Sequence, residues 1–427
     1  MKLISQRIRG MQDVLPEEGK KLLSVLKIIM SEAKLYGFDF IRTPVLEQTK
    51  LFERSAGDDS DVVNKEMYSF KDKGGREVSL RPEGTAGAMR AVLENGLHNQ
   101  TLPLKLMYFS SCYRYEKPQQ GRYREFYQLG LELFGSAEGA ADAQLISAGY
   151  SIIKKLGIEG IKLSINSIGC PECRSKYVEA LKEYFKLNLD KLCKVCCERL
   201  ERNPLRLLDC KEVQCKEVKA GAPKITDFLC DSCEQHFEDL KSNLDAMKIS
   251  YKIDPEIVRG LDYYTGTVFE FLANFDGVET AICGGGRYDN LSETLGGPYL
   301  PAVGLGFGVE RLLNVMEGRK LSAELEPKIY VASADKQASL YAQAVCGNLR
   351  EAGIIADSDI SSRSLKAQLK YASKVGFNYV IVLGNDEIQS GEGKIKNMTT
   401  GFEMKINLKN SISKQFLDIL DNDTKNI

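Results

Sequence analysis

The sequence lacks any long hydrophobic segment. Its 427 residues contain no uncharged apolar run near the roughly eighteen residues that a membrane-spanning helix needs. The opening residues, Met1 to Arg7, also lack the apolar core of a signal peptide. These absences exclude membrane-spanning and exported proteins, and we therefore expect a cytoplasmic protein that makes no membrane contact.

The sequence also has little net charge and few histidines. Its 58 Lys and Arg residues nearly balance its 59 Asp and Glu residues, which leaves a formal net charge of -1. With such a balance, nucleic acid would have to be bound through local basic patches. The two histidines, His98 and His236, lie outside every segment that carries candidate catalytic residues, so we assign no role to either.

Two common nucleotide-binding motifs are missing as well. The segment 303–313 has glycines at every second position from Gly304 to Gly308, but no Gly-Lys-Ser/Thr follows, so it is not a phosphate-binding P-loop. Its glycine spacing also differs from that of the dinucleotide fingerprint. Such glycines leave room beside a strand for a ligand, or they serve packing alone. Arg311 is predicted to lie on the helix that follows.

The chain is long enough for two or three domains. Residues 16–36 are predicted to form an amphipathic helix, because Pro16 suits its first turn and apolar residues recur at helical spacing. A strand predicted at 38–43 reaches Pro44, which cannot continue a sheet ladder. Further strands are predicted at 104–115, 125–134, 161–167, 265–272 and 278–284. Because strands lie on both sides of residues 168–250, we expect one mixed domain interrupted by an insertion.

A different pattern begins at Pro327. The predicted elements there are strands at 328–332, 354–356 and 379–383 that alternate with helices at 336–352 and 364–375. Alternating β and α elements with short links are typical of a small α/β domain with a largely parallel sheet.

Cysteine is concentrated in the insertion, which holds nine of the twelve cysteines. Without an export signal, these thiols are not expected to form a disulfide framework. Three Cys-x-x-Cys pairs begin at Cys170, Cys193 and Cys230, and two such pairs can bind one tetrahedral zinc ion. The expected zinc ligands are Cys193, Cys196, Cys230 and Cys233, with the Cys170–Cys173 pair standing apart and Cys210 and Cys215 as competing ligands. Free or buried thiols in a reducing cytosol are the alternative.

An arginine-rich hairpin is predicted between the strands at 104–115 and 125–134. Pro118 and Gly121 mark its turn, while Arg114 ends the first strand and Arg122 and Arg124 begin the return. Three guanidinium groups that converge on one hairpin suit a polyphosphate. Phe126 offers a flat face to a base. The alternative is a hairpin with solvated charges.

Three further segments are dense in polar residues. They are Leu80–Gly87, Arg259–Gly266 and Cys283–Asp289. Each taken alone is typical of an ordinary turn, because turns are rich in Gly, Asp and Tyr.

Taken together and in this order, the segments resemble the class II aminoacyl-tRNA synthetases. The opening helix and Pro44 resemble the first, dimer-forming motif of that class, the Arg114 hairpin its second, and the 306–311 segment its third. Arg-Gly-Leu-Asp-Tyr-Tyr at 259–264 and Gly-Gly-Gly-Arg-Tyr-Asp at 284–289 resemble two motifs of the histidyl-tRNA synthetase family.

The resemblance spans essentially the whole chain and implies a domain plan. Residues 1–168 and 251–326 would form an α+β catalytic domain with the antiparallel sheet of the class II core. Residues 169–250 would form the cysteine-rich insertion, and residues 327–427 an α/β anticodon-binding domain.

The resemblance also implies a reaction, in which ATP activates the carboxylate of L-histidine and Mg²⁺ bridges the phosphates. Arg114 would hold the α-phosphate beside that carboxylate, and Arg259 would take the place that a metal ion fills in related enzymes. Arg122 and Arg311 would bind the outer phosphates, and Phe126 would stack on adenine. Catalysis would be mainly positioning and fixed positive charge.

A pocket for histidine is implied next to the ATP site. Glu83 and Thr85 would bind the α-amino group with Gln128 nearby. Glu132 and Tyr264 would hydrogen-bond the imidazole, and Tyr263 would help to fix the substrate. Because side chains alternate along a strand, Gln128, Gly130 and Glu132 share one face, and Gly130 would leave room for the substrate.

The implied partners are tRNA(His), whose terminal ribose would receive the histidine, and a second copy of the chain in a homodimer. The insertion also offers basic residues that suit either a tRNA acceptor arm or a solvated charged face: Arg199, Arg202, Arg206, Lys216 and Lys219.

Two other functions compete with this interpretation. A non-catalytic regulatory subunit of histidine biosynthesis would share the core, but the unbroken segment with Arg259 and the region after Pro327 disfavour it. A synthetase for threonine, proline or glycine would also share the core, and the segments 259–264 and 284–289 disfavour that.

Overall fold

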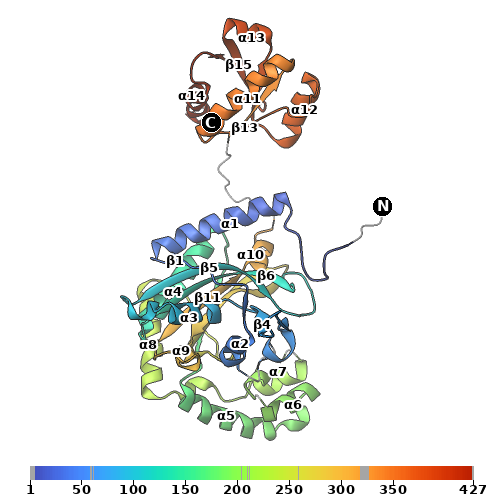
Figure 1. The fold of residues 1–427 in the computed structure, drawn as a ribbon. Coiled ribbons are helices and arrows are strands. Elements are labelled where there is room, and N and C mark those ends of the chain that lie inside the picture. The colour runs from blue at the N-terminus through green and yellow to red at the C-terminus, as the bar shows by residue number, and fades with distance from the viewer. Residues whose placement is uncertain are drawn as a thin grey trace. The chain divides into compact units, whose positions relative to one another are not determined.

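The computed structural model describes residues 5–57, 60, 62–202, 204–208, 210, 212–257, 259–317 and 327–425. The chain divides into two compact units, Met1–Leu321 and Ser322–Ile427. Figure 1 shows the elements of each unit. Among the described residues, no helix is both long and apolar enough to cross a membrane.

The first unit is built around an eight-stranded sheet with the order β1-β5-β6-β11-β10-β9-β7-β8. The strands are β1 (Asp39–Phe40), β5 (Leu104–Tyr113), β6 (Glu125–Phe134), β7 (Lys162–Ser167), β8 (Lys252–Ile253), β9 (Thr265–Phe275), β10 (Val278–Arg287) and β11 (Ala302–Gly308). Only the two edge pairs, β1 with β5 and β7 with β8, are parallel among these strands. The predicted mixed domain with an antiparallel sheet is therefore confirmed.

A smaller sheet with the order β2-β4-β3 lies in the same unit and comprises β2 (Leu46–Gln48), β3 (Ser69–Lys71) and β4 (Glu77–Leu80). Two helices accompany it, α2 (Thr49–Ala56) and α3 (Thr85–Glu94). The strand predicted at 38–43 is short, because β1 keeps only two residues of it in the main sheet. The chain passes Pro44 and then enters the smaller sheet.

The two faces of the main sheet differ in composition because side chains alternate along each strand. On one face, the apolar residues of β6, β9 and β11, such as Leu131, Phe269 and Leu305, join one core with four helices. These helices are α1 (Pro16–Leu35), α4 (Gly139–Lys155), α8 (Asp231–Ala246) and α10 (Val309–Val315). On the opposite face, Gln128, Gly130 and Glu132 of β6 lie beside the glycines of β10 and β11. We call this second surface the site face.

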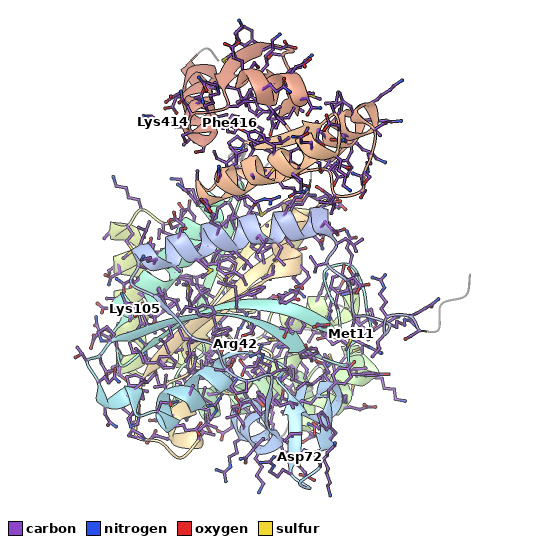
Figure 2. The ribbon with its side chains drawn as sticks, turned by 45° about the horizontal axis from the view of Figure 1, so that its top comes forward. Met11, Arg42, Asp72, Lys105, Lys414 and Phe416 are labelled. Carbon is purple, nitrogen blue, oxygen red and sulfur yellow. The ribbon has the colours of Figure 1, made fainter. Side chains whose placement is uncertain are left out.

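Helix α1 begins as the sequence predicts, with Pro16 in its first turn and the Glu18 carboxylate accepting from the Leu15 amide at 3.0 Å. It ends at Leu35, where Lys105 of β5 donates from Nζ to the Tyr36 carbonyl at 3.0 Å. Figure 2 shows Lys105 on the strand below this helix. The Lys105 ammonium group therefore joins the sheet to the C-terminal end of the helix, where carbonyl groups concentrate negative charge.

The insertion between β7 and β8 is helical and has a core of its own. It comprises α5 (Pro171–Lys186), η3 (Leu189–Lys191), α6 (Lys194–Arg202), η4 (Pro204–Leu207), α7 (Val213–Lys219), η5 (Ile225–Phe228) and α8. Within the first unit, α5, α6 and α7 lie at the end opposite α1 (Figure 1). Helix α8 instead packs into the main core through Phe237, Leu240 and Leu244. The insertion therefore joins the main core of the first unit again through α8.

The second unit has a five-stranded sheet with the order β13-β12-β14-β15-β16. Its elements are β12 (Lys328–Ser333), α11 (Lys336–Glu351), β13 (Ile355–Ser358), α12 (Leu365–Val375), β14 (Tyr379–Leu383), α13 (Asn385–Ser390), β15 (Glu392–Asn397), β16 (Glu403–Asn407) and α14 (Ile412–Lys425). Strands β12, β13 and β14 are parallel, as predicted, whereas β15 and β16 add an antiparallel edge that the sequence analysis missed. Phe416 of α14, which Figure 2 labels, packs edge-on against Tyr379, with ring centroids 5.0 Å apart.

Candidate active site

A cavity of about 220 Å³ opens on the site face of the main sheet. It is lined by residues of β6, β9, β10 and β11, by the hairpin between β5 and β6, and by the start of α10. Six of the residues that the sequence analysis assigned to catalysis or ligand binding line it: Arg114, Arg122, Phe126, Gln128, Arg259 and Arg311. Residues far apart in sequence therefore meet at one place.

The hairpin carries two of these arginines. Arg114 follows β5, donates from Nε to the Pro82 carbonyl at 2.9 Å, and holds its guanidinium carbon 5.4 Å from the centre of the Phe126 ring. Arg122 closes the turn by backbone pairing with Gln119 and forms an ion pair with Glu116. The hairpin therefore presents both guanidinium groups and one aromatic face to the cavity.

Arg124 does not join them, so the expectation that three hairpin arginines converge is wrong. Its amide donates to the Gly10 carbonyl at 2.7 Å, and its guanidinium lies 3.7 Å from the centre of the Tyr115 ring. These contacts hold Arg124 against the N-terminal segment. The third arginine near the hairpin is Arg311.

Arg311 projects from α10 and donates from Nη1 to the Ala281 carbonyl at 3.2 Å. Burial lowers the pKa of its guanidinium, and the positive charges of Arg122 and Arg114 lower that pKa further. Like charges gathered in a partly buried site raise the free energy of the protein until an anion compensates them. The arrangement therefore favours a polyanionic ligand.

Arg259 approaches the cavity from the segment before β9. Its Nη1 lies 2.5 Å from a carboxylate oxygen of Glu270, and its guanidinium carbon lies 5.4 Å from the centre of the Tyr264 ring. A methyl group at Gly284 would come within 2.6 Å of both terminal guanidinium nitrogens. Glycine on β10 thus lets this arginine lie flat on the sheet. The sequence analysis missed Glu270, which lies opposite Gly284 on the neighbouring strand β9.

A hydrogen-bonded cluster adjoins the cavity at the start of α3. The Glu83 carboxylate accepts from the amides of Thr85 at 2.6 Å and Ala86 at 2.7 Å, and so caps the helix. The Gln128 side-chain oxygen accepts from the Gly84 amide at 2.9 Å. The Tyr263 hydroxyl lies 3.5 Å from Glu83. These contacts join residues that the sequence analysis assigned to the amino-acid pocket.

Glu132 lies at the centre of this cluster and is fully buried. Its carboxylate accepts from the hydroxyls of Thr85 at 2.8 Å, Tyr108 at 3.1 Å and Tyr288. Burial raises the pKa of Glu132 to about 8, even though these hydrogen bonds favour the ionised form. The sequence analysis assigned no role to Tyr108 or Tyr288. Tyr108 pairs with Gly130 across β5 and β6, and that pairing cannot be known before the strand register is known.

The space expected over Gly130 is filled by Tyr108. A methyl group at Gly130 would lie 2.1 Å from the Tyr108 ring carbon that bears the hydroxyl. The expectation that Gly130 leaves room for the substrate is therefore wrong. A glycine removes steric bulk at its own position, but here a large side chain from the neighbouring strand occupies that volume.

The segment at 284–289 also anchors the sheet. Arg287 is buried and forms ion pairs with Asp142 at 2.9 Å and Asp289 at 2.8 Å. His236 of α8 contacts the same Asp142 carboxylate at 2.8 Å. One of the two histidines thus helps to hold α8 against the end of β10, next to Tyr288.

Sequence comparisons agree with this geometry. The family model described as histidyl-tRNA synthetase matches residues 10–192 and 202–312, and one described as anticodon binding domain matches residues 328–415. The chain belongs to the histidyl-tRNA synthetase family. Histidine–tRNA ligases of Acetivibrio thermocellus and Clostridium perfringens are 48% and 47% identical to it, over 96% and 94% of this chain and 99% and 97% of their own.

Solved structures also share the fold of this chain. The crystal structure of apo S. aureus histidyl-tRNA synthetase matches with a TM-score of 0.80 and 37% identity, and the match covers 95% of this chain and 98% of that one. An ATP phosphoribosyltransferase regulatory subunit/histidyl-tRNA synthetase from Bacillus halodurans matches with a TM-score of 0.65 and 24% identity, over 90% of this chain and all of that one. At that identity the second match shows a shared fold alone.

The insertion of this histidyl-tRNA synthetase family member holds two separate groups of thiols. One group is Cys170, Cys173, Cys230 and Cys233, and the other is Cys193, Cys196, Cys210 and Cys215. The expected set of Cys193, Cys196, Cys230 and Cys233 is therefore wrong. Helices α5 and α8 both begin where the insertion meets the sheet, so their Cys-x-x-Cys pairs meet there, whereas α6 begins inside the insertion. Either group has the composition and proximity of a metal site.

The insertion also touches the segment that carries Arg259. Arg174 of α5 donates to the Tyr264 carbonyl, and Arg206 of η4 donates to the Gly260 carbonyl at 2.8 Å. Lys219 of α7 donates to the Leu208 carbonyl at 2.7 Å and pairs with Glu256 at 2.8 Å. Two of the five basic residues considered for tRNA contacts therefore have structural partners. The Arg202 side chain lies outside the described residues.

Proposed function

We propose that this protein activates L-histidine with ATP to form histidyl-adenylate and transfers the histidine to the 3′ end of tRNA(His). The observation that carries the proposal is the convergence of Arg114, Arg122, Arg259 and Arg311 on one cavity. Family membership supports the choice of amino acid.

In the proposed reaction, the carboxylate of histidine attacks the α-phosphorus of ATP and pyrophosphate leaves. Negative charge spreads over the phosphoryl oxygens in the transition state, so fixed positive charges lower the barrier. Arg114 holds the α-phosphate beside the carboxylate, and Arg259 stabilises the same oxygens from the opposite side. Arg122 and Arg311 bind the outer phosphates, and Phe126 stacks on adenine.

For this reaction, Arg259 and Arg122 must each release a carboxylate and bind phosphate oxygens in its place. In the structure they pair with Glu270 and Glu116, both of which line the cavity. These carboxylates hold the two guanidinium groups in place before the phosphates arrive. A phosphate can replace a carboxylate as a bidentate partner without loss of hydrogen-bond geometry.

Mg²⁺ fits the carboxylates of the cavity. Glu310 lines the cavity, and its carboxylate accepts from the Tyr127 amide at 2.8 Å, which fixes it beside the cavity arginines. Burial raises the pKa of Glu310 to about 7, and a cation beside it would lower that pKa again. Mg²⁺, when bound, would neutralise charge on the phosphate oxygens. We propose Glu310 and Glu270 as its protein ligands.

Histidine would bind over the hydrogen-bonded cluster next to the cavity. Glu83, Thr85 and Gln128 would receive its α-amino group, and Tyr263 would fix it in place. Glu132 and Tyr264 would bond the two ring nitrogens of the imidazole. A site with a partner for each nitrogen discriminates against analogues that leave buried polar groups unpaired.

The second unit would bind the anticodon end of tRNA(His), in line with the family model that it matches. The terminal ribose of the same tRNA would enter the cavity of the first unit after adenylate formation. Translation in the cytoplasm is the setting that this reaction implies.

We also propose a homodimer. Three large apolar side chains at the α1 side of the first unit are exposed: Leu23 by 68%, Leu35 by 77% and Phe40 by 52%. Phe40 lies on β1, the edge strand of the sheet, whose free edge can pair or pack with a second copy. Light scattering on a sizing column should give twice the chain mass, and Phe40→Glu should shift it toward one chain mass. A wild-type monomer at micromolar concentration would rule the dimer out.

The function is tested by ATP–pyrophosphate exchange with purified full-length protein, Mg²⁺ and each standard amino acid supplied singly. We expect exchange with histidine alone, followed by histidine transfer to tRNA(His) transcripts. Exchange with threonine, proline or glycine instead would identify a different synthetase. No exchange with any amino acid, together with histidine binding measured by calorimetry, would favour a non-catalytic regulatory subunit.

A further inference from the structure

We propose that the insertion binds two zinc ions, one in each group of four thiols. The first site, Cys170, Cys173, Cys230 and Cys233, closes the base of the insertion and is called the basal site. The second, Cys193, Cys196, Cys210 and Cys215, lies inside the insertion and is called the inner site. The ions are structural, because four protein ligands leave no open position for a substrate.

The distances between sulfur atoms fit tetrahedral zinc. With Zn–S bonds of about 2.3 Å, tetrahedral coordination separates any two sulfur atoms by about 3.8 Å. Cys170 and Cys173 hold their sulfur atoms 3.5 Å apart, and Cys193 and Cys210 hold theirs 3.9 Å apart. Within each group all four sulfur atoms lie within 4.8 Å of one another. A disulfide would need about 2.05 Å, and all twelve cysteines are free.

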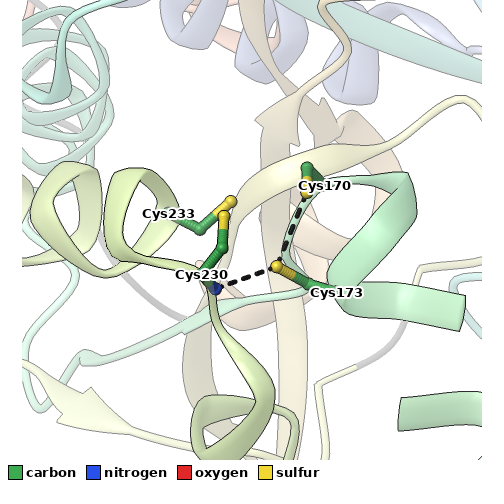
Figure 3. A group of neighbouring side chains, drawn as sticks. All are labelled: Cys170, Cys173, Cys230 and Cys233. Atoms are coloured by element: carbon green, nitrogen blue, oxygen red, sulfur yellow. Dashed lines mark hydrogen bonds between the residues drawn. The ribbon is translucent and has the colours of Figure 1, made fainter. Parts of the chain in front are cut away.

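The basal site is built by two helix starts of the same design, which Figure 3 shows facing each other. Cys170 is the N-cap of α5 and Cys230 is the N-cap of α8, and each is followed by its partner three residues later. The positive ends of both helices therefore point toward the thiolates. The Cys230 amide also donates to the Cys173 sulfur at 3.1 Å, a contact that stabilises a metal-bound thiolate.

One Cys-x-x-Cys pair of the inner site also lies at the start of a helix. Cys193 precedes α6 directly, with Cys196 in the first turn of the helix. Cys215 of α7 accepts from the Cys193 amide at 3.2 Å, and Cys210 completes the group. Cys197 is the matched contrast: it neighbours Cys196 but contacts the Leu189 carbonyl at 3.8 Å and belongs to neither group.

Both ions would help to position the segment that carries Arg259 and Tyr264. Arg174, which holds the Tyr264 carbonyl, lies one residue after Cys173 on α5. Arg206, which holds the Gly260 carbonyl at 2.8 Å, lies between Cys196 and Cys210. Each zinc site would therefore fix one arginine that positions this segment. This consequence rests on the proposed function, whereas the metal sites do not.

The test is the zinc content of full-length protein, purified from zinc-supplemented cells without chelators and measured by inductively coupled plasma mass spectrometry. We expect two zinc ions per chain. Cys230→Ser/Cys233→Ser and Cys193→Ser/Cys196→Ser should each keep one, and Cys197→Ser should keep two. A wild-type chain with no ion or one ion, iron in place of zinc, or loss of both ions in both double variants would each overturn the proposal.

A second measurement needs no variant and so remains informative if a double variant fails to fold. In native wild-type protein, mercurial titration of thiols should release zinc that a colorimetric chelator detects. We expect four thiols to be modified for each zinc ion released, in line with groups of four. Modification of the insertion thiols without any zinc release would overturn the proposal. Neither measurement uses substrate, so a failed exchange assay would leave this result intact.

Discussion

The site face of the sheet and the cysteine-rich insertion belong to the same compact unit, yet they hold their side chains by different means. On the site face, the backbone ladders of long antiparallel strands place Gln128 and Glu132 on β6 and Glu270 opposite Gly284 on β9. In the insertion, short helices surround a small core of their own, and thiols from different helices meet in groups of four. The comparison shows that precise placement can come from backbone ladders or from side-chain clusters, and that each depends on different residues.

The largest expected effect is on the chemistry of the site face. Arg259→Ala should lower histidine-dependent ATP–pyrophosphate exchange by about a thousandfold, because it removes one fixed charge from the developing phosphoryl oxygens. Arg76→Ala is the control, since Arg76 is exposed and pairs with Asp72 at 2.7 Å in a surface turn away from the cavity residues (Figure 2 marks Asp72). A similar loss in both variants would mean that the effect is not specific to the cavity.

Core truncations should separate the two regions by stability. Leu131→Ala in the main core and Leu181→Ala in the insertion core each remove a fully buried side chain, which costs about 2–5 kcal/mol. Because the two cores are separate, hydrogen exchange should rise throughout the sheet for Leu131→Ala but only within α5, α6 and α7 for Leu181→Ala. Equal acceleration in the sheet by Leu181→Ala would show that the insertion and the sheet unfold together.

The dependence of stability on pH should report the buried carboxylate of the site face. Burial raises the pKa of Glu132 to about 8 from its ordinary value of 4.5. Between these values the folded state keeps a proton that the unfolded state releases, so stability falls as pH rises, by up to about 1.4 kcal/mol per pH unit. Glu132→Gln should reduce this slope in urea unfolding measured from about pH 5 to about pH 8, and Glu310, whose pKa burial raises to about 7, should account for part of the remainder. An unchanged slope would assign the titration to another group.

The smallest expected effect links the two regions. Arg174→Ala removes the contact between α5 and the Tyr264 carbonyl, so it should raise the KM for histidine by about threefold to tenfold, which is the free energy of an ordinary net hydrogen bond, about 0.7–1.4 kcal/mol. The KM for ATP should stay unchanged, and Arg174→Lys should restore part of the loss. A fall in kcat with both KM values unchanged would contradict this positioning role.

Much of the site face was predictable from the sequence, because strand alternation and turn residues are local patterns. Alternation along residues 125–134 predicted that Gln128 and Glu132 share one face, and the turn residues Pro118 and Gly121 predicted the hairpin that carries Arg114. The contributions of Tyr108 and Glu270 were missed because they depend on which residue faces which across neighbouring strands. Alternation within one strand gives the face on which each side chain lies, but it does not identify the residue opposite on the neighbouring strand.

The insertion was predictable only as a module. The spacing of each Cys-x-x-Cys pair shows that its two thiols share one helix start, but which pairs meet depends on the path of α5 to α8. The edge strands β15 and β16 were missed for a similar reason, since their residues are mostly polar and pair at the border of the sheet. Contacts between separate helices thus decided the error in the cysteine groups, and polar composition decided the error in the edge strands.

The pairing of Gly284 with Gly306 across β10 and β11 limits how this pocket can be altered. Backbone forms the floor of the cavity at this pair, and any side chain introduced there would intrude on Arg259 or Gln128, with a methyl carbon 2.6 Å from either one. Redesign of specificity would therefore have to begin at residues other than this glycine pair. An inhibitor that rests on this floor would leave the protein few substitutions through which to acquire resistance.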